Sequence, residues 1–208
     1  MIDNRKLCAA EQVAEILNRL TNSSNVVVIG RIFGPLSEEI VRQALDLIQD
    51  HHARLNSRIV GDLDNLRFET GAKKIPLRVL DKQYEGQWQE TVLEELNTQI
   101  ESSEVLLRAV LVQEQELGEN SASHLIITIH HAIADALSSI QLYSELLSYC
   151  SKVASGEPLV PVSRLPALPS MDELFPPSTK GFRGKINRPL AKYISCYNNK
   201  FIPLTSFG

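Results

Sequence analysis

Hydrophobic residues recur at helical spacing in four separate stretches of the chain. Apolar side chains three or four positions apart predict an amphipathic helix over residues 9–20. The same spacing predicts helices over residues 37–52, 88–100 and 136–150. Ser37 is expected to cap the second of these, because its hydroxyl can accept a hydrogen bond from a free backbone N–H of the first turn.

Between these helices lie short runs of apolar and β-branched residues, which are typical of strands. These runs cover residues 26–33, 55–60, 65–68, 75–80, 105–112 and 125–129. Residues 113–123 are polar, contain one glycine and separate the last two runs, so they predict a hairpin loop. Helices and strands therefore mix along residues 1–155, which indicates an α/β body.

The composition changes after residue 155. Eight of the ten prolines lie between residues 158 and 208. Proline removes a backbone donor and restricts the residue before it, so this stretch cannot form long regular elements. We therefore interpret residues 156–208 as an extended crossover or linker that leads away from the α/β body.

Composition and charge exclude several classes of function. The chain has 208 residues, 43% apolar and 22% charged, as a globular protein does. Its 25 acids and 21 bases give a net charge of −4, which lacks the basic excess expected of a nucleic-acid-binding protein. No apolar run approaches the roughly 18 residues of a spanning helix. The start does not resemble a secretory signal, and three scattered cysteines suit a reducing cytoplasm.

Candidate chemistry lies at the end of the run at residues 125–129. The apolar run leads into His130 and His131, and Asp135 follows where the next helix should begin. Because side chains alternate along a strand, the two imidazoles should point in opposite directions, one into the body and one into a cleft. A histidine held at a strand end is suited to accepting a proton near neutral pH.

This His-His-x-x-x-Asp pattern resembles the motif of the chloramphenicol-acetyltransferase-like acyltransferases. That superfamily includes condensation domains of peptide synthetases, alcohol acetyltransferases and polyketide-associated acyltransferases. Further similar segments are Arg5-Lys6-Leu7 with Glu11, residues 51–58, residues 105–109 and residues 166–174. The resemblance implies a sandwich lobe over residues 1–155, with a mixed, mostly antiparallel sheet and helices packed chiefly on one face.

The resemblance also implies a reaction. An acyl group would pass from a thioester, on coenzyme A or on a phosphopantetheinyl carrier protein, to a hydroxyl or amine acceptor, without a tightly bound cofactor. His131 would be the general base and His130 a positioning residue. Asp135 would pair with an arginine, for which the sequence offers the candidates Arg31, Arg54, Arg58 and Arg108.

Three departures from the family pattern affect this interpretation. Ala136 replaces a glycine, which would cost about 1–2 kcal/mol if the site required a positive φ. Asn56 stands where many condensation domains have arginine, which favours the acetyltransferase-like branch. Family members with the motif here are also about twice as long, so we expect a second lobe, or a partner chain, to complete the site.

Other functions stay open. The chain could be a short acetyltransferase with an active site between subunits, or a non-catalytic module that docks a carrier protein or partner chain. A metal site is not expected at the motif, because His131 and Asp135 supply only two ligands. His51 and His52 are interpreted as a solvated helix end.

Overall fold

We describe the fold from a computed structural model of the chain. It describes residues 4–22, 24–114, 121–157, 163–167 and 169–170. The described residues up to Ala167 belong to one compact unit, and the described residues after it belong to another. Most of the expected crossover at 156–208 lies outside the described residues. Its described residues are 156–157 and 163–167, which belong to the first unit, and 169–170, which belong to the second.

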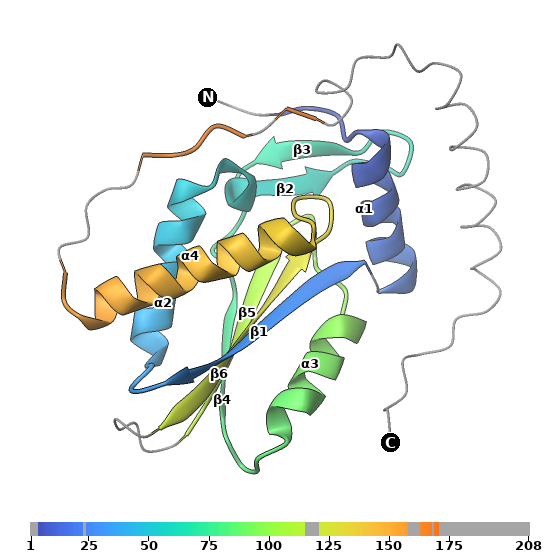
Figure 1. Ribbon diagram of the computed structural model, residues 1–208. Coiled ribbons are helices and arrows are strands. Elements are labelled where there is room, and N and C mark those ends of the chain that lie inside the picture. Colours follow the sequence, from blue (N-terminus) through green and yellow to red (C-terminus); the bar gives the residue numbers. More distant parts are fainter. Residues whose placement is uncertain (1–3, 23, 115–120, 158–162, 168, 171–208) are drawn as a thin grey trace. The chain divides into compact units, whose positions relative to one another are not determined.

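A four-stranded sheet lies at the centre of the first unit (Figure 1). Its strands, in spatial order, are β1 (Asn25–Phe33), β6 (Ala122–His130), β5 (Leu107–Gln113) and β4 (Leu77–Asp81). The pairs β1–β6 and β6–β5 are antiparallel, and β4–β5 is parallel. This confirms the mixed, mostly antiparallel sheet.

Helices cover both faces of this sheet. The helices α2 (Glu38–His51) and α4 (Ala136–Ala154) share one core with the β6 side chains Leu125, Ile127 and Ile129. On the opposite face, α3 (Gln87–Asn97) contributes Val92 to a smaller cluster around Ile126. The alternation of β6 side chains explains why one strand supplies both cores. The two longest helices thus lie on one face, as expected, and α3 covers part of the other.

A small second sheet lies beside the main one. It pairs β2 (Ser57–Val60) with β3 (Arg67–Thr70), next to α1 (Ala9–Thr21). Residues 53–56, expected partly within the first of these strands, form the 3-10 turn η1 (Ala53–Asn56) instead. The turn closes because the Leu55 N–H donates to the His52 carbonyl. Ile59 and Phe68 anchor a separate core beneath this hairpin.

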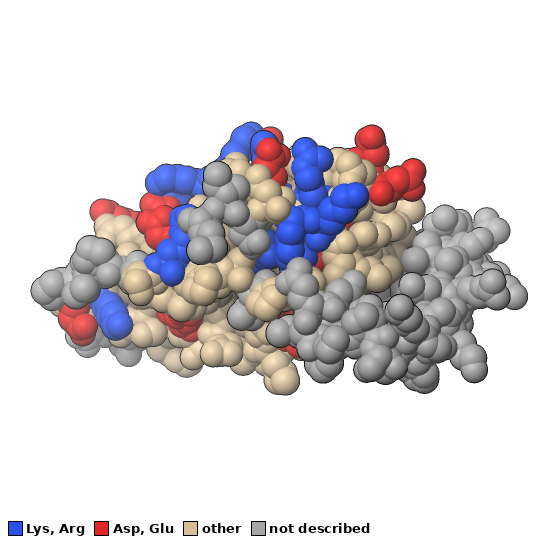
Figure 2. Space-filling view, turned by 90° about the horizontal axis from the view of Figure 1, so that it is seen from above, with Lys and Arg blue, Asp and Glu red and all other residues tan. Residues whose placement is uncertain are grey.

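Within the described residues, no helix is long and apolar enough to cross a membrane. Figure 2 shows basic and acidic side chains close together on the face seen from above, with uncharged surface between them.

Candidate active site

The two histidines of the motif lie at the end of β6 in opposite environments. His130 is the last residue of the strand and is fully buried. His131 is the first residue of the turn that follows, and its side chain is exposed. The helix α4 begins five residues later, after Asp135. The strand, turn and helix that the sequence predicts are therefore all present.

His130 links this turn to α1. Its Nε2 lies 2.8 Å from Oε2 of Glu15, and neither side chain is exposed. Its Nδ1 accepts a hydrogen bond of 3.1 Å from the Ala132 backbone N–H. A ring nitrogen that accepts carries no proton, so the ring N–H lies on Nε2, the nitrogen in close polar contact with the carboxylate. His130 is therefore a positioning residue and is unavailable to a substrate.

Glu15 is the buried carboxylate that receives these contacts. Ser102 donates its hydroxyl to Oε1 at 2.6 Å, and Arg19 Nε lies 2.5 Å from the same oxygen. Burial raises the pKa of the Glu15 carboxyl, but its contacts with His130, Ser102 and Arg19 together bring that pKa below its ordinary value. The carboxylate thus stays ionised inside the protein.

The backbone around His131 is held on both sides. Its N–H donates to the Ser24 carbonyl at 3.3 Å, and the Ile133 N–H donates to the His130 carbonyl at 3.1 Å. The side chains of Ala132 and Ile133 pack into the core beneath the β2–β3 hairpin. The turn therefore presents one exposed imidazole from a fixed backbone.

Asp135 is a helix cap. Its carboxylate accepts a hydrogen bond of 2.8 Å from the Ser138 N–H at the start of α4. This hydrogen bond lowers the pKa of the Asp135 carboxyl. Ala136 begins the helix, and positive φ angles among the described non-glycine residues occur only at Asn22 and Ser24. Alanine in place of the family glycine therefore costs no backbone strain.

The arginine pairing implied for Asp135 is not formed within the described part of the chain. The four candidates have other contacts in the structure. Arg108 pairs with Glu95, Arg58 pairs with Glu69, Arg31 lies over the Phe33 ring and Arg54 lies over the Phe68 ring. The Asp135 carboxylate instead accepts a hydrogen bond from the first turn of α4.

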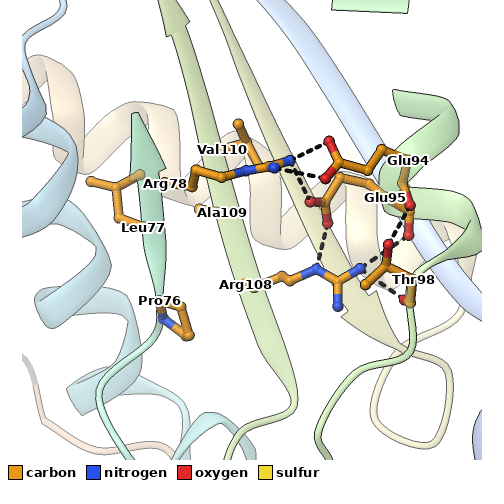
Figure 3. A pocket seen from close by; sticks show the side chains of 9 residues that line it. All are labelled: Pro76, Leu77, Arg78, Glu94, Glu95, Thr98, Arg108, Ala109 and Val110. Atoms are coloured by element: carbon orange, nitrogen blue, oxygen red, sulfur yellow. Dashed lines mark hydrogen bonds and ion pairs between the residues drawn. The ribbon is translucent and has the colours of Figure 1, made fainter. Parts of the chain in front are cut away.

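Two pockets formed by the described residues lie away from the motif, and neither is lined by His131. The larger, of about 250 Å³, lies between β4, β5 and α3 (Figure 3). In it, Arg78 pairs with Glu94 and Arg108 with Glu95, so its charged groups already have partners.

Two buried carboxylates were not recognised from the sequence. Glu15 supports His130, and Glu95 accepts hydrogen bonds from Arg108 and from the Thr128 hydroxyl on β6. Both lie in helices whose apolar spacing was clear. Neither gave a signal, because an inward-facing glutamate is recognised only once its partner on another element is known.

Comparison with known proteins agrees with this architecture. The family model described as the condensation domain matches residues 12–165. No curated protein sequence matches the chain. Polyketide synthase associated protein 5 from Mycobacterium tuberculosis is a similar solved structure, with a TM-score of 0.59 and 22% identity, over 82% of this chain and 38% of that one.

Two further solved structures share the fold. The starter condensation domain of the rhizomide synthetase RzmA gives a TM-score of 0.65 at 17% identity, over 82% of this chain and 43% of that one. The X-domain from teicoplanin biosynthesis gives a TM-score of 0.64 at 21% identity, over 78% of this chain and 35% of that one. The chain thus spans about two fifths of these relatives, a match confined to one lobe. By its family match over residues 12–165, the chain belongs to the condensation-domain family.

Proposed function

We propose that this chain is the N-terminal lobe of an acyltransferase in which His131 is the general base. Its imidazole would accept the proton of an acceptor hydroxyl or amine as the acceptor attacks a thioester carbonyl. The carbon–sulfur bond then breaks, and the thiolate leaves and takes up a proton. Such a base contributes about 10²–10⁴-fold to the rate.

The observation that carries this proposal is the exposed imidazole on a fixed turn. His130, Glu15 and the core beneath the hairpin hold the backbone of the turn, while the His131 ring stays open to a ligand. A histidine serving only to fill the core would be buried, as His130 is. Catalysis requires a base that is both accessible and positioned.

The proposed donor is a thioester on coenzyme A or on a carrier protein. The starter condensation domain of the rhizomide synthetase, in a mutant form, has been solved in complex with C8-CoA. The lobe and the donor would meet in the cytoplasm, where coenzyme A thioesters are available. We propose that residues 1–155 form the acyltransferase lobe and residues 156–208 the crossover.

A second lobe, in the same gene product or on a partner chain, would form the other wall of the site. Leu137 and Ile140 lie in the first turns of α4, directly after the motif, and are 78% and 58% exposed. Exposed apolar residues next to a functional motif favour a covered surface in the working protein. This lobe would also complete a groove beside His131.

The test is acyl transfer by the complete gene product. Thiol release from an acyl-CoA should depend on an added acceptor and should fall by about 10²–10⁴-fold in His131→Ala. Thermal unfolding should be unchanged, because the His131 ring is exposed. Gln141→Ala, an exposed change on α4, is the matched control and should keep the rate.

The same assay separates the alternatives. Equal turnover in the wild type and His131→Ala would contradict the proposal. Lack of any turnover, together with binding of a phosphopantetheinyl carrier protein, would instead support a non-catalytic docking module. If the 208-residue chain is active without a second lobe, but only when it forms an oligomer, the result would support an active site between subunits.

A further inference from the structure

A second histidine pair, at the end of α2, meets a glutamate of α4. His52 Nε2 lies 2.8 Å from Glu145 Oε2, and His51 Nε2 lies 3.7 Å from Glu145 Oε1. One ligand atom from each of the three residues falls within 4.8 Å of the others. His51 ends α2, His52 follows it, and Glu145 lies within α4, so two separate elements build the cluster.

The cluster is open enough for a small ion to enter. The side chains of His51, His52 and Glu145 are 16%, 27% and 29% exposed, so all three are half-buried rather than solvated. This differs from the solvated helix end expected for the histidines. Packing of α2 against α4 accounts for the difference, because it brings Glu145 over the end of α2.

The geometry points to a site for one divalent transition-metal ion, such as Zn²⁺, which we propose is bound by His51, His52 and Glu145. Imidazole nitrogens and carboxylate oxygens are the ligands zinc accepts, at about 2.0–2.2 Å. Two imidazoles among three ligands disfavour Ca²⁺ and Mg²⁺, which prefer oxygen. The fourth zinc position would be taken by water.

The contacts without metal leave His51 incompletely satisfied. Its Nε2 is 3.7 Å from Glu145, beyond hydrogen-bond distance, and its buried Nδ1 has no hydrogen-bond partner among the described residues. Glu145 is already oriented, because the Tyr149 hydroxyl donates to its Oε1 at 3.1 Å. An ion between the three side chains would bring His51 into the cluster, with Tyr149 holding the carboxylate from outside.

Such an ion would act as a clamp. The His51 carbonyl accepts a hydrogen bond of 2.8 Å from the Leu165 N–H, and His52 forms an isolated parallel bridge with Leu165. The end of α2 therefore contacts both α4 and Leu165 in the proline-rich stretch. Metal at His51 and His52 would stabilise all three segments together.

Zinc titration of the full 208-residue chain, stripped of metal, tests this inference. Calorimetry should give one Zn²⁺ per chain. At zinc about a hundred times the dissociation constant, the melting temperature should rise by on the order of 5 °C. Co²⁺ in place of zinc should give the visible absorption of a tetrahedral site.

Variants then assign the ligands. His51→Ala, His52→Ala and Glu145→Gln should each weaken zinc binding by more than about a hundredfold, and Tyr149→Phe, outside the metal, by about tenfold. His131→Ala, which removes the exposed histidine of the motif, is the control and should bind zinc as the wild type does. Circular dichroism without metal checks that each variant folds, and Glu145→Gln keeps the shape of the side chain if an alanine variant does not.

Three results would overturn the inference. They are failure of the wild type to take up zinc, unchanged zinc affinity in folded His51→Ala and Glu145→Gln, and loss of binding in His131→Ala. The last would place the ion at the motif. None of these measurements depends on acyl transfer, so they test the metal site independently of the proposed function.

Discussion

His130 Nε2 and Glu15 Oε2 meet at 2.8 Å with no exposure of either side chain. One residue ends a central strand, and the other lies in the first helix. Their contact is the polar link between α1 and the turn that carries His131. The accessible histidine thus depends on a buried pair that a substrate cannot reach.

Glu15→Ala should destabilise the protein by about 1–3 kcal/mol. The substitution leaves the buried Ser102 hydroxyl without its acceptor and removes the carboxylate beside His130 Nε2, and both losses destabilise the folded state. Urea denaturation followed by circular dichroism measures the change. Glu15→Gln, which keeps the volume and one carbonyl oxygen, should cost less. Equal stability of Glu15→Ala and the wild type would contradict this account.

The same carboxylate makes stability depend on pH. Since the pKa of Glu15 is lowered in the folded protein from 4.5, its contribution is present above about pH 4.5 and is lost as the pH falls toward the lower folded value. Denaturant unfolding at successive pH values below 4.5 should show the loss. In Glu15→Gln, the free energy of unfolding should not show this decrease below pH 4.5. If Glu15→Gln lost stability with falling pH as steeply as the wild type, other groups would be the cause.

The main elements could be predicted because their side-chain spacing carries the information. The apolar run at 125–129 indicated β6, and its alternation placed His130 and His131 in different environments. The polar contacts between elements could not be predicted. Whether Glu15 faces water or His130 depends on how α1 docks, and helical spacing alone does not define that docking.

The arrangement of the strands shows the same limit. The runs at 55–60 and 65–68 indicated strands, but not that they would pair only with each other, apart from the main sheet. The cluster of two histidines and a glutamate could not be predicted from the sequence either. His51 and His52 are adjacent, while Glu145 reaches them only because α2 packs against α4.

Gly30→Ala should destabilise the core by about 1–3 kcal/mol through overpacking. A Cβ at Gly30 would lie 2.5 Å from the Tyr143 hydroxyl oxygen, which donates a hydrogen bond of 2.8 Å to the Leu125 carbonyl. Chemical denaturation measures the effect. Combining Gly30→Ala with Tyr143→Phe removes the nearest atom, so the double variant should lose less than the sum of the single changes. Additive losses would show that the hydroxyl is not the obstacle.

Asp135→Ala should lower stability by about 0.5–2 kcal/mol, because the Ser138 N–H loses its capping acceptor. Asp135→Asn keeps a capping oxygen and should remain close to the wild type. Thermal unfolding of both variants distinguishes the cap from a charge effect. A loss in the asparagine variant as large as in the alanine variant would indicate that the negative charge, rather than the cap, is required.

The double variant Leu137→Ser/Ile140→Ser tests whether a second lobe covers these two side chains in the complete gene product. In the 208-residue chain both side chains are exposed, so the free energy of unfolding should change by less than about 0.5 kcal/mol, while self-association in sedimentation experiments should decrease. In the complete gene product the same pair of changes should be destabilising, because a second lobe packed on α4 would lose two apolar contacts. Lys152→Ser, far along α4, is the control. Equal, negligible effects in both proteins would mean that no second lobe covers these residues.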